Sequence, residues 1–284
     1  MTQKFLSVLA FSLSLGLGLT ACNNSTNPES QKLILTGSST VAPLASEIAK
    51  KFEAEYPEVR IDVQTGGSSR GLADAAQGLA DIGMISRALK EEETDQFQSY
   101  AIATDGIGII LEGSNPVQSL SNQQVVDIYT GKIDNWQEVG GDNAPITVVN
   151  KAAGRSTLEL FLDYFQLENS QIQADVIIGD NQQGIKTIAG NKNAIGYVSI
   201  GAAERDINAG VPLKLLSVGG INASTQTVQD GSFPLSRPLN LVTTQTPTGL
   251  TAEFIQFAQS EKVHDLVEAQ NLVPIFPNKM VQTQ

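Results

Sequence analysis

Residues 32–52, KLILTGSSTVAPLASEIAKKF, contain the pattern on which the fold prediction rests. A short apolar run at 32–36 enters the polar turn 37–40, which consists of Gly, Ser, Ser and Thr. From residue 41 to 56 the apolar side chains recur at the spacing of a helix, and Pro57 ends that helix. The segment therefore predicts a strand, a short polar turn and a helix in succession.

The same order of strand, turn and helix recurs along the chain. Further strands are predicted at residues 59–64, 81–85, 102–111, 146–150, 174–178, 194–200 and 239–243. Further helices are predicted at residues 72–79, 121–129, 158–165 and 251–268. Alternating strands and helices indicate an α/β architecture with largely parallel sheets.

The first 22 residues have the features of an export signal. One positive charge, Lys4, precedes a 15-residue apolar stretch from Phe5 to Leu19, which is shorter than the ~20 residues needed to span a bilayer. Small residues then lead to Cys22, the single cysteine, as in a bacterial lipobox. We expect residues 1–21 to be removed and Cys22 to be lipidated; the alternative is a chance cysteine after an ordinary signal peptide.

Residues 22–31 are polar and lack apolar periodicity, so we expect a flexible tether between the lipid anchor and a folded domain. Removal of residues 1–21 leaves 263 residues, enough for one large or two modest domains. The full chain has a net charge of −12. This charge argues against nucleic acid as a partner, because phosphodiester backbones require a basic face. It does not exclude a small anion, which local dipoles can hold.

Three turns share a composition that suits anion binding. They are residues 36–41, 65–71 and 154–157, each rich in Gly, Ser and Thr between a predicted strand and a helix. A helix start offers unpaired N–H groups and a positive dipole end, while hydroxyls add further donors. Each turn alone is also explained as an ordinary N-cap. The set of three, with Ser86-Arg87 after another strand, favours a shared oxyanion site at the carboxyl ends of the strands.

Several segments resemble the PstS-type phosphate-binding periplasmic proteins over nearly all of the chain after residue 31. The matching segments are TGSSTVAP (36–43), DIGMISR (81–87), TDGI (104–107), IYTGKIDNW (128–136), AIGYVS (194–199) and LSRPL (235–239). The resemblance implies a two-lobed periplasmic-binding-protein fold of type II with two crossover segments. It places the lobes at residues 32–110 plus 238–284 and at residues 111–237, closing on an anion as a hinged clamp.

The resemblance also implies the ligand-binding residues. They are Ser39, Thr40, the Val41 backbone, Ser68, Ser86, Arg87, Arg155, Ser156 and Thr157, with Ser38, Arg70 and Lys151 as further members. Arg87 is the expected charged partner. Lys151 stands where the family commonly has arginine, and Arg155-Ser156 replaces Ser-Gly, so a planar guanidinium fork is displaced to a neighbouring position.

Phosphate at neutral pH retains a proton, so a selective site should offer a carboxylate acceptor. Asp105, at the end of a predicted strand, is the candidate for that role, or else a helix cap or turn carboxylate. The departures at residues 151–156 leave sulfate, molybdate or a phosphonate as alternative ligands.

Other chemistries find little support in the residues. His264 is the single histidine and lies among polar residues, so a serine nucleophile lacks an adjacent base. One cysteine and one histidine do not make a metal site, and no phosphate-binding loop of the GxxxxGK[ST] type is present. Glu91–Glu93 is interpreted as a solvated helix start.

The sequence therefore predicts a monomeric, non-enzymatic binding protein without cofactor or metal. We expect it to be exported, lipid-anchored at the bacterial cell membrane, and to deliver phosphate or a related oxyanion to an ABC permease. A sensor with the same clamp and a phosphatase using Ser39 or Thr40 as nucleophile are the alternative hypotheses.

Overall fold

The computed structural model describes residues 31–275. The predicted signal peptide, the lipidation site Cys22 and the predicted tether up to residue 30 lie outside the described residues.

The opening segment folds as its pattern predicts. The strand β1 (Gln31–Gly37) runs into a turn and then into α1 (Ala42–Glu55), whose apolar face is buried. The chain continues through β2 (Val59–Thr65), α2 (Ser68–Ala76) and β3 (Ile82–Ile85). Strand β1 lies between β2 and β3 and is parallel to both, so the three turns that follow these strands lie at one edge.

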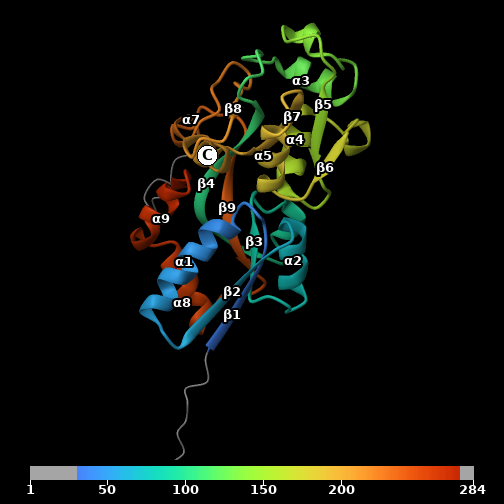
Figure 1. Cartoon of the computed structure of the whole chain (residues 1–284). Helices are drawn as coiled ribbons and strands as arrows, with labels where there is room; N and C mark the ends of the chain where they lie inside the picture. Colours follow the sequence, from blue (N-terminus) through green and yellow to red (C-terminus); the bar gives the residue numbers. More distant parts are fainter. Residues whose placement is uncertain (1–30, 276–284) are drawn as a thin grey trace, which may run out of the picture.

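Two long strands pass through the middle of the molecule (Figure 1). They are β4 (Gln98–Glu112) and β9 (Ser236–Thr243), paired antiparallel with Asp105 opposite Arg237. Each is predominantly buried, because each continues from one packed region of the molecule into the other. They are the two crossover segments that the fold prediction requires.

The remaining elements complete the chain. Between β4 and β9 lie α3 (Asn122–Tyr129), β5 (Thr147–Lys151), α4 (Ser156–Phe165), β6 (Val176–Ile178), α5 (Asn181–Ala189), β7 (Ala194–Ser199), α6 (Ile200–Asn208), β8 (Leu213–Leu215) and α7 (Thr225–Gln229). After β9 come α8 (Gly249–Ala258), α9 (His264–Ala269) and β10 (Val273–Pro274). Short 3₁₀ turns are η1 (Glu91–Glu93), η2 (Trp136–Val139), η3 (Asn169–Gln171) and η4 (Glu261–Val263).

The strands form a continuous ladder in the order β2-β1-β3-β9-β4-β7-β5-β6. The outer pairs are parallel, but β3 with β9, β9 with β4 and β4 with β7 are antiparallel. The expectation of largely parallel sheets was therefore wrong for the middle of the ladder. For the two pairs that include β9, the cause is the return of the chain, which enters the first sheet from the opposite direction.

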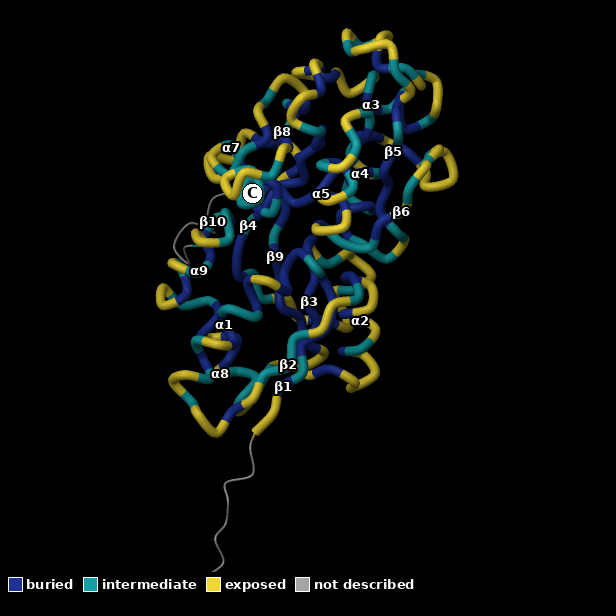
Figure 2. Tube along the Cα trace, in the orientation of Figure 1, coloured by how far each residue is buried: buried dark blue, intermediate teal, exposed yellow. Residues whose placement is uncertain are grey.

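Two large hydrophobic clusters lie on either side of the crossover strands. One contains residues from 33–103 and 239–272 and defines the first half of the molecule; the other contains residues from 107–235 and defines the second half. The buried trace follows the strands and inner helix faces in both halves, with exposed loops outside (Figure 2). The lobe boundaries implied by the family resemblance stay a prediction.

Within residues 31–275, no helix is both long enough and apolar enough to cross a bilayer.

Candidate functional site

The predicted loops meet in one small pocket where the two halves touch. The residues that line this pocket, called the loop pocket below, are Ser38, Ser39, Thr40, Gly67, Ser68, Ser86, Arg155, Ser156 and Thr157. The backbone N–H of Ser69 in the first half donates to the Gly154 carbonyl in the second half at 3.3 Å. The carboxyl ends of β1, β2, β3 and β5 therefore converge, as the α/β rule on ligand position predicts.

Arg237 lies behind the loop pocket and was not among the predicted site residues. It extends from β9, is 2% exposed, and directs its guanidinium toward the pocket wall. Its Nη1 donates to Thr157 Oγ1 at 2.9 Å and to Ser86 Oγ at 3.3 Å, and its Nη2 donates to Thr40 Oγ1 at 3.3 Å. One buried cation thus holds hydroxyls from both halves.

These contacts fix the direction in which Thr40 can donate. A hydroxyl group has one proton and two acceptor lone pairs. Thr40 Oγ1 already accepts from Arg237 Nη2 and from Asn181 Nδ2, the latter at 3.1 Å. With both lone pairs occupied, the Thr40 proton must point elsewhere, and Thr40 lines the loop pocket. In this orientation of the Asn181 amide, Thr40 is a hydrogen-bond donor toward the pocket, which suits an anion.

Asp105 holds Arg237 rather than facing the loop pocket. Its Oδ2 accepts from Arg237 Nη2 at 2.9 Å and from Nε at 3.3 Å, and its Oδ1 accepts from Ser199 Oγ and the Gly201 N–H. Both carboxylate oxygens are therefore engaged, and both side chains of the pair are 1% exposed. The hypothesis that Asp105 accepts the proton of phosphate is replaced by a role in orienting Arg237.

Two groups of the second half face the loop pocket without a protein partner. Ser156 Oγ is buried and has no hydrogen-bond partner among the described residues. A buried polar atom without a partner carries a free-energy cost, so its survival at a pocket wall points to a ligand atom. Arg155 also lines the pocket, and its guanidinium makes no hydrogen bond or ion pair with the described part of the chain.

Arg87 does not take the place that the sequence suggested. Its guanidinium donates to both carboxylate oxygens of Glu93, at 2.7 and 2.8 Å, and to Glu159 Oε2 at 3.0 Å. The hydrogen bond from Arg87 is the main cause that lowers the pKa of Glu93. Arg87 is thus paired with protein carboxylates, one of them in α4 of the second half, whereas Arg237 contacts the hydroxyls of the loop pocket. The interpretation of Glu91–Glu93 as fully solvated was wrong for Glu93.

Two other predicted residues, Val41 and Arg70, do not line the loop pocket. Val41 is fully buried and its N–H donates to Ser38 Oγ at 3.4 Å, as does the Thr40 N–H at 3.2 Å. Ser38 thereby occupies backbone donors that we expected to face the ligand. Arg70 is exposed and forms an ion pair with Asp74 one turn along α2, pointing away from the site.

Lys151, at the end of β5, stands behind the pocket wall. It is 3% exposed, and its Nζ donates to Asn181 Oδ1 at 3.1 Å. Asn181 begins α5, and its Nδ2 donates a second hydrogen bond to Thr40 Oγ1. Lys151 therefore reaches the loop pocket through one intervening side chain.

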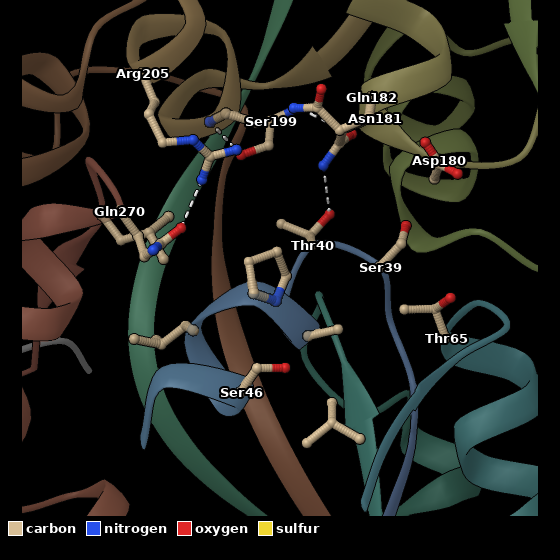
Figure 3. Close-up of a pocket in the computed structure, with 16 residues that line it drawn as sticks. Ser39, Thr40, Ser46, Thr65, Asp180, Asn181, Gln182, Ser199, Arg205 and Gln270 are labelled. Carbon is tan, nitrogen blue, oxygen red and sulfur yellow. Dashed lines mark hydrogen bonds between the residues drawn. The ribbon is translucent and has the colours of Figure 1, made fainter. Parts of the chain in front are cut away.

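A larger cavity of about 350 Å³ adjoins the loop pocket and shares Ser39 and Thr40 with it. Figure 3 shows Asn181 joined to Thr40 on one side of this cavity and Arg205 joined to Gln270 on another. The loop pocket has a volume of about 10 Å³, close to the space of one water. Because this volume holds about one water, the surrounding loops must separate for an ion to enter.

Gly67 lies where the two halves are in close contact, and a substitution there tests that contact. Its φ is +99°, and a Cβ there would lie 2.7 Å from the Gly154 carbonyl oxygen and 2.9 Å from Arg155 Cδ. We expect Gly67→Ala to weaken ligand binding by about tenfold or more, because the halves can no longer approach. The matched control is Gly78→Ala, which also has positive φ, +68°, but no atom within 4 Å of the added Cβ. Both variants should lose about 1 kcal/mol of stability, and equal affinity in the two would contradict the contact.

Neither His264 nor a metal-binding cluster lies at the loop pocket among the described residues. His264, the only histidine of the sequence, lines a different cavity with Ala101 and Ile102 in the first half. Among residues 31–275, no group of three or more His, Cys, Asp or Glu side chains is placed to hold a metal ion. The contacts to Thr40 Oγ1 come from donors, so none of them can accept its proton.

Sequence reasoning missed Arg237 and Asn181, although each had a signal. Arg237 is the one charged residue in the segment 235–243, and Asp105 is the one charged residue in the run 102–111. Single opposite charges in two buried strands indicate a buried pair. Asn181 begins a helix after Gly179-Asp180, which is the same strand, turn and helix design without Ser or Thr.

Comparisons with known proteins identify the family of the chain. The family profile described as a PBP superfamily domain matches residues 23–262. The phosphate-binding protein PstS of Bacillus subtilis is 30% identical over 258 residues, covering 89% of this chain and 84% of that protein. PstS of Borreliella burgdorferi is 26% identical and covers 96% of this chain and 99% of that protein.

Solved structures give the same result. A Clostridium perfringens putative phosphate ABC transporter substrate-binding protein with bound phosphate is 32% identical, with a TM-score of 0.80 over 87% of this chain and 100% of that one. An ABC-type phosphate transport receptor from Vibrio cholerae is 28% identical, with a TM-score of 0.71 over 86% of this chain and 100% of that one. The chain therefore belongs to the PBP superfamily, in its family of PstS-type phosphate-binding proteins.

Proposed function

We propose that the protein binds inorganic phosphate in the loop pocket and delivers it to an ABC permease. The observation that carries the proposal is the position of Arg237, which is held by Asp105 and donates to Thr40, Ser86 and Thr157. These contacts leave hydroxyl protons to point at a ligand. Because Asp105 balances the charge of Arg237, the positive charge for a dianion comes from Arg155, which lines the pocket without a carboxylate partner among the described residues. Donors from both halves would replace the hydration shell of the ion.

The mechanism that we propose is closure of two lobes, residues 32–110 plus 238–284 and residues 111–237, around the ion. The contacts that would form on closure are present in the structure: Ser69 with Gly154, Arg87 with Glu159, and Asn181 with Thr40. Each joins the first half to the second. Export and a lipid anchor at Cys22 complete the proposal and are supported by the sequence before residue 31.

A phosphatase is disfavoured by a specific arrangement. A nucleophilic Thr40 would need an acceptor for its proton, but its oxygen is contacted by the donors Asn181 Nδ2 and Arg237 Nη2.

Selectivity between oxyanions follows from the role of Asp105. No carboxylate lines the loop pocket among the described residues, so none accepts the proton of HPO₄²⁻ or repels sulfate. We expect phosphate to bind 1:1, and sulfate to bind measurably more weakly, with discrimination far below the ~10⁴–10⁵-fold that a buried hydrogen bond to one ligand group can give. Calorimetric titrations with phosphate, sulfate and molybdate at one pH measure this.

The outcomes separate the alternatives. A binding signal with phosphate but with neither sulfate nor molybdate would contradict the expected weak selectivity. It would indicate that a group outside the lining of the loop pocket accepts the proton of phosphate. A binding signal with molybdate or sulfate but not with phosphate would identify that oxyanion as the ligand. Absence of heat with all three would contradict the proposed function.

A further inference from the structure

Lys151 is a buried cation without a direct counter-charge. Its Nζ has a hydrogen bond to the neutral Asn181 side chain, and among residues 31–275 no carboxylate oxygen lies within 4.0 Å of it. The side chain is 3% exposed, so water cannot compensate the charge. Burying an ammonium without a paired anion is costly, and a lysine in this position tends to lose its proton.

The charged groups around Lys151 come from several elements and are mostly positive. Burial and the charge of Arg237 in β9 lower the pKa of Lys151, Asp180 before α5 opposes them, and Arg155 before α4 lowers it further, to about 7. Asp105 in β4 is committed to Arg237. From β7, the Tyr197 hydroxyl accepts from the Lys151 backbone N–H and donates to Asn150, and burial raises the pKa of this phenol, so it stays neutral.

We propose that Lys151 takes up a proton when an oxyanion enters the loop pocket, so that affinity depends on pH through this one side chain. The inference rests on the proposed function, because it requires an anion on the far side of Thr40. A dianion there would provide the negative charge that the surroundings of Lys151 lack. An opposite charge in a buried, poorly solvated region favours the protonated form of a lysine.

The hydrogen bond to Asn181 links the protonation state of Lys151 to the orientation of the Asn181 side-chain amide. An ammonium group has only donors, so protonated Lys151 requires the Asn181 oxygen to face it and directs the Asn181 Nδ2 toward Thr40. The Ser199 N–H supports the same orientation at 3.4 Å. A neutral amine has a lone pair and tolerates the reverse orientation, in which Thr40 would donate to Asn181 instead of to the anion. Protonated Lys151 thereby keeps Thr40 a donor to the ligand.

Calorimetry at pH 8 in two buffers of different ionisation enthalpy measures the proton directly. Inorganic phosphate is then almost entirely a dianion, while Lys151 is mostly neutral in the free protein, so we expect uptake of nearly one proton per phosphate bound. Above about pH 7.5 the affinity should fall roughly tenfold per pH unit.

Three variants assign that proton to Lys151. Lys151→Arg keeps a permanent charge and should bind phosphate with no proton uptake and little change between pH 7.5 and 9. Lys151→Met should bind more weakly at pH 7 and also take up no proton. The matched control is Lys214→Met: burial also lowers the pKa of Lys214, but this lysine lies in β8 and contacts Asn115, so proton uptake should remain as in the unaltered protein.

A measurement without ligand provides an independent check. Because the folded pKa of Lys151 lies below the unfolded value, the unfolded chain binds more protons between about pH 7 and 10.5. The stability of the unaltered protein should therefore rise with pH in this window relative to Lys151→Met. Below about pH 7 the buried charge of Lys151 lowers the free energy of unfolding by its full amount. Above pH 10.5, where the lysine is neutral in both states, this effect disappears.

The results distinguish the inference from the proposed function. Phosphate binding with no proton uptake at pH 8, or with uptake that persists in Lys151→Arg, overturns the role of Lys151 alone. Absence of phosphate binding at every pH overturns both proposals. If Lys151→Arg does not fold, the two-buffer titrations of the unaltered protein and of Lys151→Met still decide the question.

Discussion

Replacement of Arg237 by Met is expected to weaken phosphate binding by at least about 100-fold. Arg237 is the buried cation behind the loop pocket and donates to Thr40, Ser86 and Thr157. Its removal takes away the positive charge and also frees the hydroxyl lone pairs, so the hydroxyls are no longer held as donors. Loss of one partner of a buried charged contact costs about 2–5 kcal/mol, and about 1.4 kcal/mol corresponds to a tenfold change in affinity. Calorimetric titration of the folded variant measures the loss.

Arg205→Met is the matched control for this experiment. Arg205 lines the larger adjoining cavity, where it contacts Gln270, and does not line the loop pocket. If the ion binds in the loop pocket, Arg205→Met should change the affinity by less than about threefold. A large loss with Arg205→Met and a small one with Arg237→Met would place the ligand in the larger cavity and contradict the assigned site.

Replacement of Asp105 by Asn is expected to destabilise the fold by about 3–5 kcal/mol. The substitution keeps the shape of the side chain but leaves the Arg237 guanidinium buried without its counter-charge, since both partners are 1% exposed. Whichever way the amide turns, its nitrogen faces a donor, either the Arg237 guanidinium or the Gly201 N–H. Chemical denaturation in the absence of phosphate measures the change in the free energy of unfolding.

Two comparisons test the cause of this destabilisation. Asp142→Asn removes one partner of the exposed ion pair with Lys192 and should change stability by less than about 1 kcal/mol. The double variant with Asp105→Asn and Arg237→Met should regain stability over Asp105→Asn alone, because the uncompensated charge is gone. Equal stability of the unaltered protein and Asp105→Asn would show that the pair does not act as a buried ion pair.

The fold could be predicted where apolar periodicity is strong. The helix expected at 41–56 is α1 (Ala42–Glu55), and the strand expected at 102–111 lies within β4 (Gln98–Glu112). The helix α5 (Asn181–Ala189) was not predicted, because its two buried isoleucines are too few for a periodic signal. The single helix expected at 251–268 is divided after Ala258, where a polar turn precedes η4 and α9.

The candidate site could be predicted in its loops but not in its charges. Turn composition identifies hydroxyl and backbone donors, because the same short segment forms the strand end, the turn and the helix start. The choice between Arg87 and Arg237 depends on contacts between distant segments. Glu93 and Glu159 occupy Arg87, whereas Arg237 reaches the hydroxyls from β9. Local sequence does not determine which carboxylate neutralises which arginine.

The role of Asp105 also could not be predicted from local sequence. Its position at a strand end made it a plausible acceptor for a ligand proton, but the antiparallel register of β4 and β9 places it directly opposite Arg237. That register follows from the return of the chain through β9, which no local pattern specifies.

Diffraction from crystals grown with phosphate tests the central claim most directly, because it locates the ion. We expect the ion in the loop pocket, within hydrogen-bond distance of Thr40 Oγ1, Ser156 Oγ and the Arg155 guanidinium, with Arg237 still paired with Asp105. An ion found in the Arg205 cavity, or only on the outer surface with the loop pocket unchanged, would contradict the account.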